Sequence, residues 1–107
     1  MKPTRLEQLQ QMINAEPGDT FLLFALAMEY LSLNNKVLAL EHFESLRLKS
    51  PDYLPLYYQL ATLLNELNKK DQAIGMLEAG IELAKRLKQN KTQMELQNLL
   101  SMIAFDD

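Results

Sequence analysis

The side chains that could perform chemistry are few and scattered along this sequence. His42 is the only histidine, and it stands between Glu41 and Glu44 with no second histidine to share a metal or a proton. A metal site needs several ligands at fixed spacing, and acid–base catalysis needs a base with an orienting partner. His42 is therefore interpreted as a solvated surface residue, and Glu41, Glu44 and Glu78 as residues on the polar faces of helices.

Nucleophiles and phosphate loops are missing as well. The chain has no cysteine, which excludes disulfides, thiolate metal sites and thiol nucleophiles. Gly75 and Gly80 are interpreted as packing residues, because both fall inside a predicted helix and no strand precedes them. The chain is therefore predicted not to be an enzyme, and neither a cofactor nor a metal is expected.

Composition limits the class of protein. The 107 residues are 48% hydrophobic and carry a formal net charge of −3, which fits one domain over residues 1–107 and gives no reason to expect nucleic-acid binding. No signal-peptide pattern and no membrane-spanning stretch is visible, so no membrane association and a cytoplasmic location are expected. The basic cluster Lys85, Arg86, Lys88 and Lys91 is interpreted as compensation of a helix dipole, with a site for an acidic partner as the alternative.

Apolar residues recur at helical spacing throughout, so six helices and no strands are predicted. Thr4 and Thr92 each precede a glutamate by three residues, which predicts capping boxes for the first and last helix. Asp19 and Asp52 follow Pro-containing breaks and are predicted to cap the second and fourth. Asp106 and Asp107 are expected to fray. The helices are predicted over about residues 4–16, 20–33, 36–48, 53–67, 71–88 and 92–105.

The sequence also repeats itself. Pro17 and Pro51 stand 34 residues apart, and each is followed within two residues by an aspartate. Residues 20–53 placed over residues 54–87 agree at these positions: Leu22/Leu56, Leu26/Leu60, Ala27/Ala61, Leu33/Leu67, Asn34/Asn68, Lys36/Lys70, Ala39/Ala73 and Glu44/Glu78.

This pattern resembles the tetratricopeptide repeat, in which large and small residues stand at fixed helical offsets before a closing proline. The first repeat supplies Leu23, Leu26, Ala27, Tyr30, Ala39, Phe43 and Pro51, and the second supplies Tyr57, Leu60, Ala61, Leu64, Ala73, Leu77 and Gly80. The second repeat has Lys85 in place of the closing proline, and Leu23 and Tyr57 replace the frequent tryptophan.

The resemblance implies an all-α fold of antiparallel helix-turn-helix repeats, stacked as a short right-handed superhelix. Residues 20–53 and 54–87 are the expected repeats, and residues 4–16 and 92–105 the expected terminal capping helices.

In this family the first helix of each repeat lines a concave groove that holds a segment of a partner protein. The resemblance therefore implies a partner-binding face made of Phe21, Phe24, Met28, Leu31, Tyr58, Thr62, Asn65 and Glu66, which Gln97 and Ser101 extend. The alternative for Phe21 and Phe24 is ordinary core, covered by a terminal helix. Phe24 and Met28 stand where a carboxylate-gripping subgroup of the family has a basic residue and an asparagine, so no carboxylate clamp is predicted.

The leading hypothesis is a protein-interaction module, or scaffold, that binds a peptide or helix of another protein in this groove. The alternative is an assembly subunit whose apolar groove mediates homo-oligomer formation. A regulatory subunit of an enzyme is the remote alternative.

Overall fold

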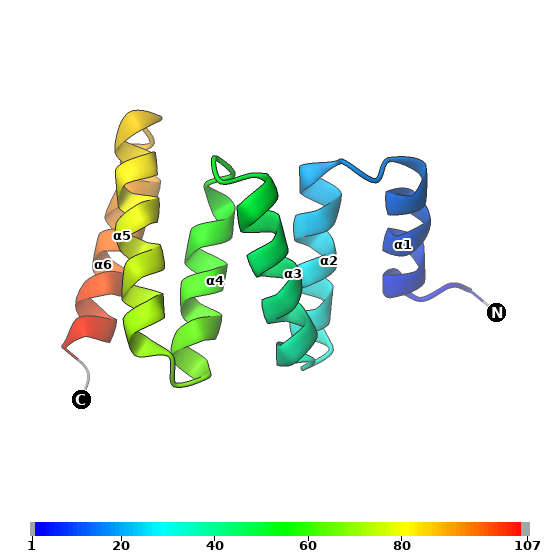
Figure 1. The fold of residues 1–107 in the computed structure, drawn as a ribbon, viewed down its shortest axis with the longest axis horizontal. Helices are drawn as coiled ribbons and strands as arrows, with labels where there is room; N and C mark the ends of the chain where they lie inside the picture. The colour runs from blue at the N-terminus through cyan, green and yellow to red at the C-terminus, as the bar shows by residue number, and fades with distance from the viewer. Residues whose placement is uncertain (1, 106–107) are drawn as a thin grey trace. The chain divides into compact units, whose positions relative to one another are not determined.

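The computed structural model describes residues 2–105, and all regular structure in this range is helical (Figure 1). The prediction for Asp106 and Asp107 lies outside these residues. The all-α fold class is confirmed. The helices are α1 (Arg5–Ala15), α2 (Thr20–Ser32), α3 (Lys36–Lys49), α4 (Pro55–Glu66), α5 (Lys70–Arg86) and α6 (Asn90–Ala104).

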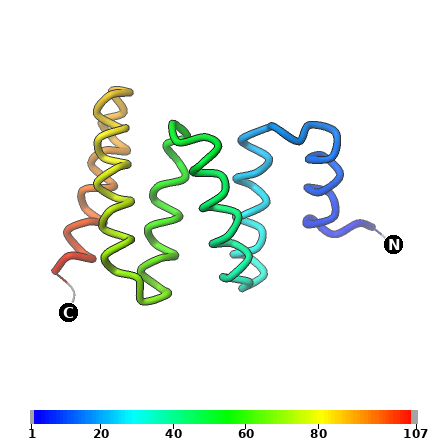
Figure 2. The backbone as a smooth tube through the Cα atoms, in the orientation of Figure 1, coloured from blue at the N-terminus to red at the C-terminus, as the bar shows by residue number. Residues whose placement is uncertain are grey.

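The chain forms two compact units, residues 1–51 and residues 52–107. Consecutive helices within each unit run antiparallel, as the backbone tube shows (Figure 2). The helix pairs α2–α3 and α4–α5 fall within the two predicted repeats, whereas a single domain over residues 1–107 stays a prediction. None of the helices in the described range is long and apolar enough to cross a membrane.

In the N-terminal unit, α2 packs against both α1 and α3. Ala27 of α2 and Ala39 of α3 are fully buried, as expected where two helices approach closely. The hydroxyls of Thr20 and Ser50 lie 2.9 Å apart and join the start of α2 to the end of α3. The other buried side chains of this unit are Leu9, Leu26, Phe43 and Leu46.

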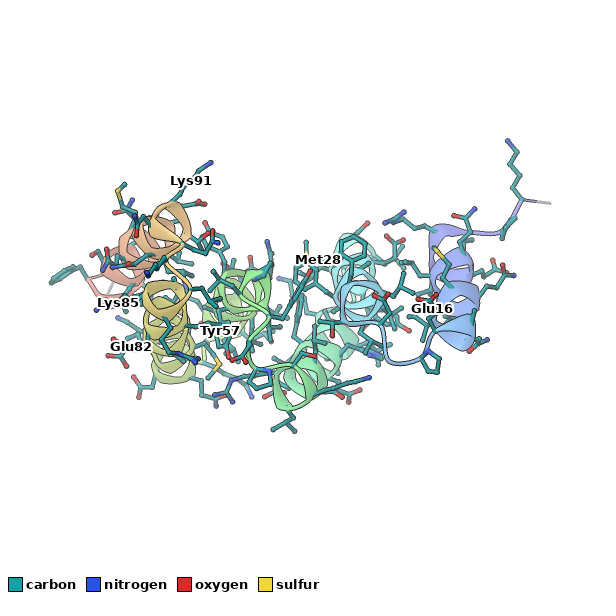
Figure 3. All side chains as sticks on the ribbon, turned by 90° about the horizontal axis from the view of Figure 1, so that it is seen from above. Glu16, Met28, Tyr57, Glu82, Lys85 and Lys91 are labelled. Atoms are coloured by element: carbon teal, nitrogen blue, oxygen red, sulfur yellow. The ribbon has the colours of Figure 1, made fainter. Side chains whose placement is uncertain are left out.

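In the C-terminal unit, α5 packs against both α4 and α6. Tyr57 points from α4 toward α5 (Figure 3) and meets the backbone of Gly80. A β-carbon at Gly80 would stand 2.8 Å from Tyr57 Cβ, closer than such atoms approach, and 3.1 Å from Leu96 Cδ1, which is a tight contact. Gly80 is therefore the point at which α5 can touch both of its neighbours.

Two of the predicted helix caps are confirmed. The Glu7 amide donates to Thr4 Oγ1 at 3.1 Å, and Glu7 Oε1 accepts from the Thr4 amide at 3.2 Å, which completes the capping box. Asp19 Oδ1 accepts from the Leu22 amide at 3.0 Å. These bonds satisfy amide groups that a helix start leaves without a partner.

The predicted cap at Asp52 is wrong. Helix α4 begins at Pro55, and its N-cap residue Leu54 makes no side-chain cap bond. Proline has no amide hydrogen, and the next amides, of Leu56 and Tyr57, donate to the carbonyls of Tyr53 and Leu54 at 3.2 Å. A tight backbone turn thus satisfies the amides that a side-chain cap would otherwise satisfy. Asp52 instead lies 3.5 Å from Arg86 Nη2.

The predicted capping box at Thr92 is also wrong. Helix α5 ends at Arg86, and α6 begins at Asn90 without a side-chain cap, so Thr92 lies inside the first turn. Lys88 takes the left-handed conformation, with φ 57°, and the Gln89 amide donates to the Ala84 carbonyl at 2.9 Å. This Schellman turn is short and leads directly into α6.

Candidate partner-binding surfaces

Three predicted site residues lie together on α2. Phe21, Phe24 and Met28 are spaced three and four residues apart, which places them on one helix face. They line a shallow hollow of about 230 Å³, here called the α2 hollow, with Arg5, Ala25 and Glu29. The predicted grouping of these three side chains is therefore present within the N-terminal unit.

The two phenylalanines differ in environment. Phe21 is 65% exposed. Phe24 is half-buried, and its ring centroid lies 6.0 Å from that of the fully buried Phe43, with the rings tilted by 55°. Phe21 is thus a surface residue, whereas Phe24 belongs partly to the core. The core contact of Phe24 is to Phe43 of α3, and a partner-binding role for either ring stays a prediction.

One edge of the α2 hollow is charged but balanced. Arg5 Nε of α1 lies 3.7 Å from Glu29 Oε1 of α2, and the Glu29 side chain is largely covered while that of Arg5 is largely exposed. Since the two charges compensate, the hollow offers an apolar floor and a neutral edge. Such a surface suits an apolar side chain better than a carboxylate.

Tyr58 lies in a larger hollow of about 690 Å³ in the C-terminal unit, here called the α4–α6 hollow. It is formed by the N-terminal parts of α4 and α6 and by the turn after α5. Apolar groups are mixed with two amides, two hydroxyls and one carboxylate, as in sites that orient a ligand. The lining residues are Leu54, Pro55, Tyr58, Gln59, Leu87, Gln89, Thr92 and Glu95.

Four predicted site residues line neither hollow. Leu31, Thr62 and Asn65 are half-buried and Glu66 is exposed. The Thr62 hydroxyl donates to the Tyr58 carbonyl at 2.8 Å, an internal bond of α4. The backbone oxygen of Asn65 accepts from the Asn68 amide in the turn that ends the same helix.

Helix α6 contributes different residues from those expected. Gln97 and Ser101 are exposed but line neither hollow, while Thr92 and Glu95 line the α4–α6 hollow. The sequence reasoning missed these two because it began α6 two residues late and assigned Thr92 to a cap. The position of Lys88 could have indicated the earlier start of α6, because Lys88 follows the end of a helix as Asn34 and Asn68 do. A lysine, however, is not a residue type that indicates a left-handed turn.

His42 is less solvated than predicted. Its side chain is half-buried and stacks on Tyr30, with ring centroids 5.1 Å apart and planes within 16°. The aromatic ring of α2 thus covers one face of the imidazole. Among residues 2–105, no three histidine, cysteine, aspartate or glutamate side chains are grouped so that they could hold a metal ion.

The basic cluster divides into separate environments. Lys85 and Arg86 lie in the last turn of α5, where cations compensate the helix dipole as expected. Lys85 Nζ lies 3.5 Å from Glu82, and Arg86 reaches Asp52. Lys88 stands in the turn, and Lys91 lies in the first turn of α6, where the dipole does not favour a cation. The dipole interpretation is therefore wrong for Lys91, whereas Lys88 directly follows the C-terminal end of α5.

The helix pairs α2–α3 and α4–α5, with their buried alanines and 34-residue period, define a protein of helix-pair repeats. A tetratricopeptide repeat domain protein from Salinibacter ruber has a similar crystal structure, with a TM-score of 0.79 and 36% sequence identity over 83% of this chain and 99% of that one. A solution structure of a tetratricopeptide repeat domain protein from the same organism has a TM-score of 0.80 and 36% sequence identity, over 84% of this chain and 92% of that one. The chain belongs to the tetratricopeptide repeat family.

A further solution structure, of a protein from Bordetella parapertussis, shares the fold with a TM-score of 0.83 and 22% identity, over 96% of this chain and 90% of that one. No family model matches the sequence, and no curated protein matches it.

Proposed function

We propose that this protein is an interaction module that binds a peptide or helical segment of another protein. The binding surfaces in this proposal are the α2 hollow and the α4–α6 hollow, one in each unit. The proposal assigns the protein no catalytic role and a cytoplasmic location. Proteins of this family generally mediate contacts between proteins, which supports the proposal.

The observation that carries the proposal is the exposed apolar face of α2. Phe21 is 65% exposed beside Met28 and Phe24, although α2 already buries Leu26 on its opposite side. A large exposed aromatic ring at the rim of a hollow is the kind of residue that dominates binding energy when a partner covers it. A partner segment with large apolar side chains fits this surface.

The α4–α6 hollow adds polar recognition. Gln59, Gln89 and Thr92 offer both donors and acceptors at its wall, which can hold the backbone of a bound segment while Tyr58 and Leu87 contact a side chain. Neither hollow collects an uncompensated cation among its lining residues, so a partner is recognised by apolar and amide groups and not by a terminal carboxylate.

A peptide library displayed on phage tests this function. Peptides enriched on the wild-type chain are synthesised, and their dissociation constants are measured by calorimetry. We expect Phe21→Ser or Tyr58→Ser to weaken binding about tenfold, since anchor residues carry most of the energy. Leu48→Ser is the control, because Leu48 is exposed but lines neither hollow. Failure to enrich any peptide, or equal losses in all three variants, would contradict the proposal.

A further inference from the structure

Helix α6 carries an exposed stripe that neither hollow uses. Met94, Asn98, Ser101 and Phe105 are all exposed, and they are spaced four, three and four residues apart. This spacing puts them on one line along the helix, as in the seam of a coiled coil. Met94 is 59% and Phe105 86% exposed. These four residues are here called the α6 seam.

The α6 seam faces away from the core of its own unit. Leu96 and Ile103 are the buried residues of α6, and helical geometry places them on the opposite side of the helix from Met94 and Phe105. The large apolar groups of the seam therefore have no role in the packing of α6 against α5. An exposed aromatic ring and a thioether aligned on one face indicate a surface that another helix covers.

The seam is complementary to itself. Its large residues stand at the two ends and its small polar residues in the middle, symmetrically about the midpoint between Leu99 and Leu100. If a second copy lies antiparallel, Met94 faces Phe105 of that copy and Asn98 faces its Ser101. Thioether–aromatic contacts then form at both ends, and amide–hydroxyl hydrogen bonds form where the small residues allow the helices to approach.

We propose that two copies of this chain associate through the α6 seam, with the two α6 helices antiparallel about a two-fold axis. Each seam contributes the same residues to both sides, so the interface is closed and the assembly stops at a dimer. This goes beyond the proposed function, because the α6 residues of the α4–α6 hollow, Thr92 and Glu95, are not in the seam. The hollow stays available to a partner in the dimer.

The charges of α6 favour the antiparallel arrangement. Lys91 and Glu95 are its only charged residues, and Lys91 projects from the start of the helix away from α5 (Figure 3). Antiparallel pairing brings Lys91 near the C-terminal end of the other α6, the negative pole of its dipole, which Asp106 and Asp107 follow in sequence. Parallel pairing would instead place like charges at the same height along the two helices, Lys91 beside Lys91 and Glu95 beside Glu95.

The dimer is expected to be weak. One face of a 15-residue helix covers less than the roughly 1,200 Å² typical of stable interfaces. The mass measured by light scattering should therefore rise from monomer to dimer over a concentration series. Phe105→Ser and Met94→Ser should each raise the dimer dissociation constant about tenfold, whereas the control Leu48→Ser, a similarly exposed residue on α3, should not change it.

Cysteine cross-linking tests the register, since the chain has no cysteine of its own. In an oxidised equimolar mixture of Asn98→Cys and Ser101→Cys chains, we expect the mixed disulfide to exceed the sum of the two symmetric disulfides, because random pairing would make these two amounts equal. A monomer at every concentration, a dimer indifferent to Phe105→Ser, or a mixed disulfide that does not exceed this sum would overturn the proposal. A dimer abolished by Phe21→Ser or Tyr58→Ser instead would assign self-association to the hollows. Peptide binding to the hollows is measured separately and does not depend on any of these outcomes.

Discussion

Single residues decide how closely the helices approach, and the two glycines of α5 show this in opposite ways. A β-carbon at Gly80 would collide with Tyr57 and Leu96, while one at Gly75 would meet nothing within 4 Å. The sequence analysis interpreted both as packing residues. Only Gly80 is one, because the sequence reveals that a glycine lies in a helix but not what stands beside it.

We therefore expect opposite effects from the same substitution at these sites. Gly80→Ala should lower the free energy of unfolding by about 2 kcal/mol through overpacking, and Gly75→Ala should raise it by about 1 kcal/mol through better helix propensity. Urea denaturation followed by circular dichroism measures both. Equal effects of the two substitutions would mean that α5 does not touch α4 and α6 at Gly80.

The two phenylalanines of α2 give a second residue-scale prediction. Phe24→Ser should cost about 2 kcal/mol of stability, because its half-buried ring packs on Phe43. Phe21→Ser should change stability by less than about 0.5 kcal/mol, because that ring is exposed. The same urea experiment separates them. A large loss of stability with Phe21→Ser would make that residue core and remove it from the α2 hollow.

At the scale of the helix, some of the residues predicted to cap a helix make the capping hydrogen bond and others do not. Asp19 accepts a hydrogen bond from the Leu22 amide, while Asp52 is exposed and only pairs with Arg86. Asp19→Ala should therefore cost about 1 kcal/mol, and Asp52→Ala at most a few tenths. Thermal unfolding of the two variants side by side gives the comparison. Similar losses in both would show that Asp52 caps α4 in solution.

The turns that end α2, α4 and α5 share one conformation but not one residue type. Asn34, Asn68 and Lys88 have φ of 58°, 62° and 57°. Asparagine tolerates this conformation, whereas a lysine is strained in it. Lys88→Gly should raise the free energy of unfolding by about 0.5–1 kcal/mol. Lys85→Gly, inside α5, is the control and should lower it by about 1 kcal/mol.

These elements also show what the sequence could predict. The six helices followed from apolar periodicity, and the antiparallel pairs followed from the resemblance to the tetratricopeptide repeat that the 34-residue period indicated. The starts of α4 and α6 did not follow, because a proline turn and a left-handed lysine can each replace a side-chain cap. Half of the predicted site residues lie in the hollows. The spacing of residues along a helix predicts which of them share a face, but it does not predict which neighbouring helices and turns form a hollow with that face.

At the scale of the whole molecule, stability is expected to come from apolar burial. Among the described residues, none of the fully buried side chains is polar or charged. The ion pairs Arg5–Glu29, Lys85–Glu82 and Arg86–Asp52 each contain at least one well-exposed side chain. Exposed pairs contribute about 0–1 kcal/mol each and are screened by salt.

The free energy of unfolding should therefore change by less than about 1 kcal/mol between low salt and about 1 M NaCl. Urea titrations at several salt concentrations measure it, at a protein concentration low enough to keep the chain monomeric. Arg5→Gln, which removes the pair with the best-covered partner, should reduce even this small dependence. A steep loss of stability with salt would mean that ion pairs, and not the alanine and leucine contacts between helices, stabilise each unit.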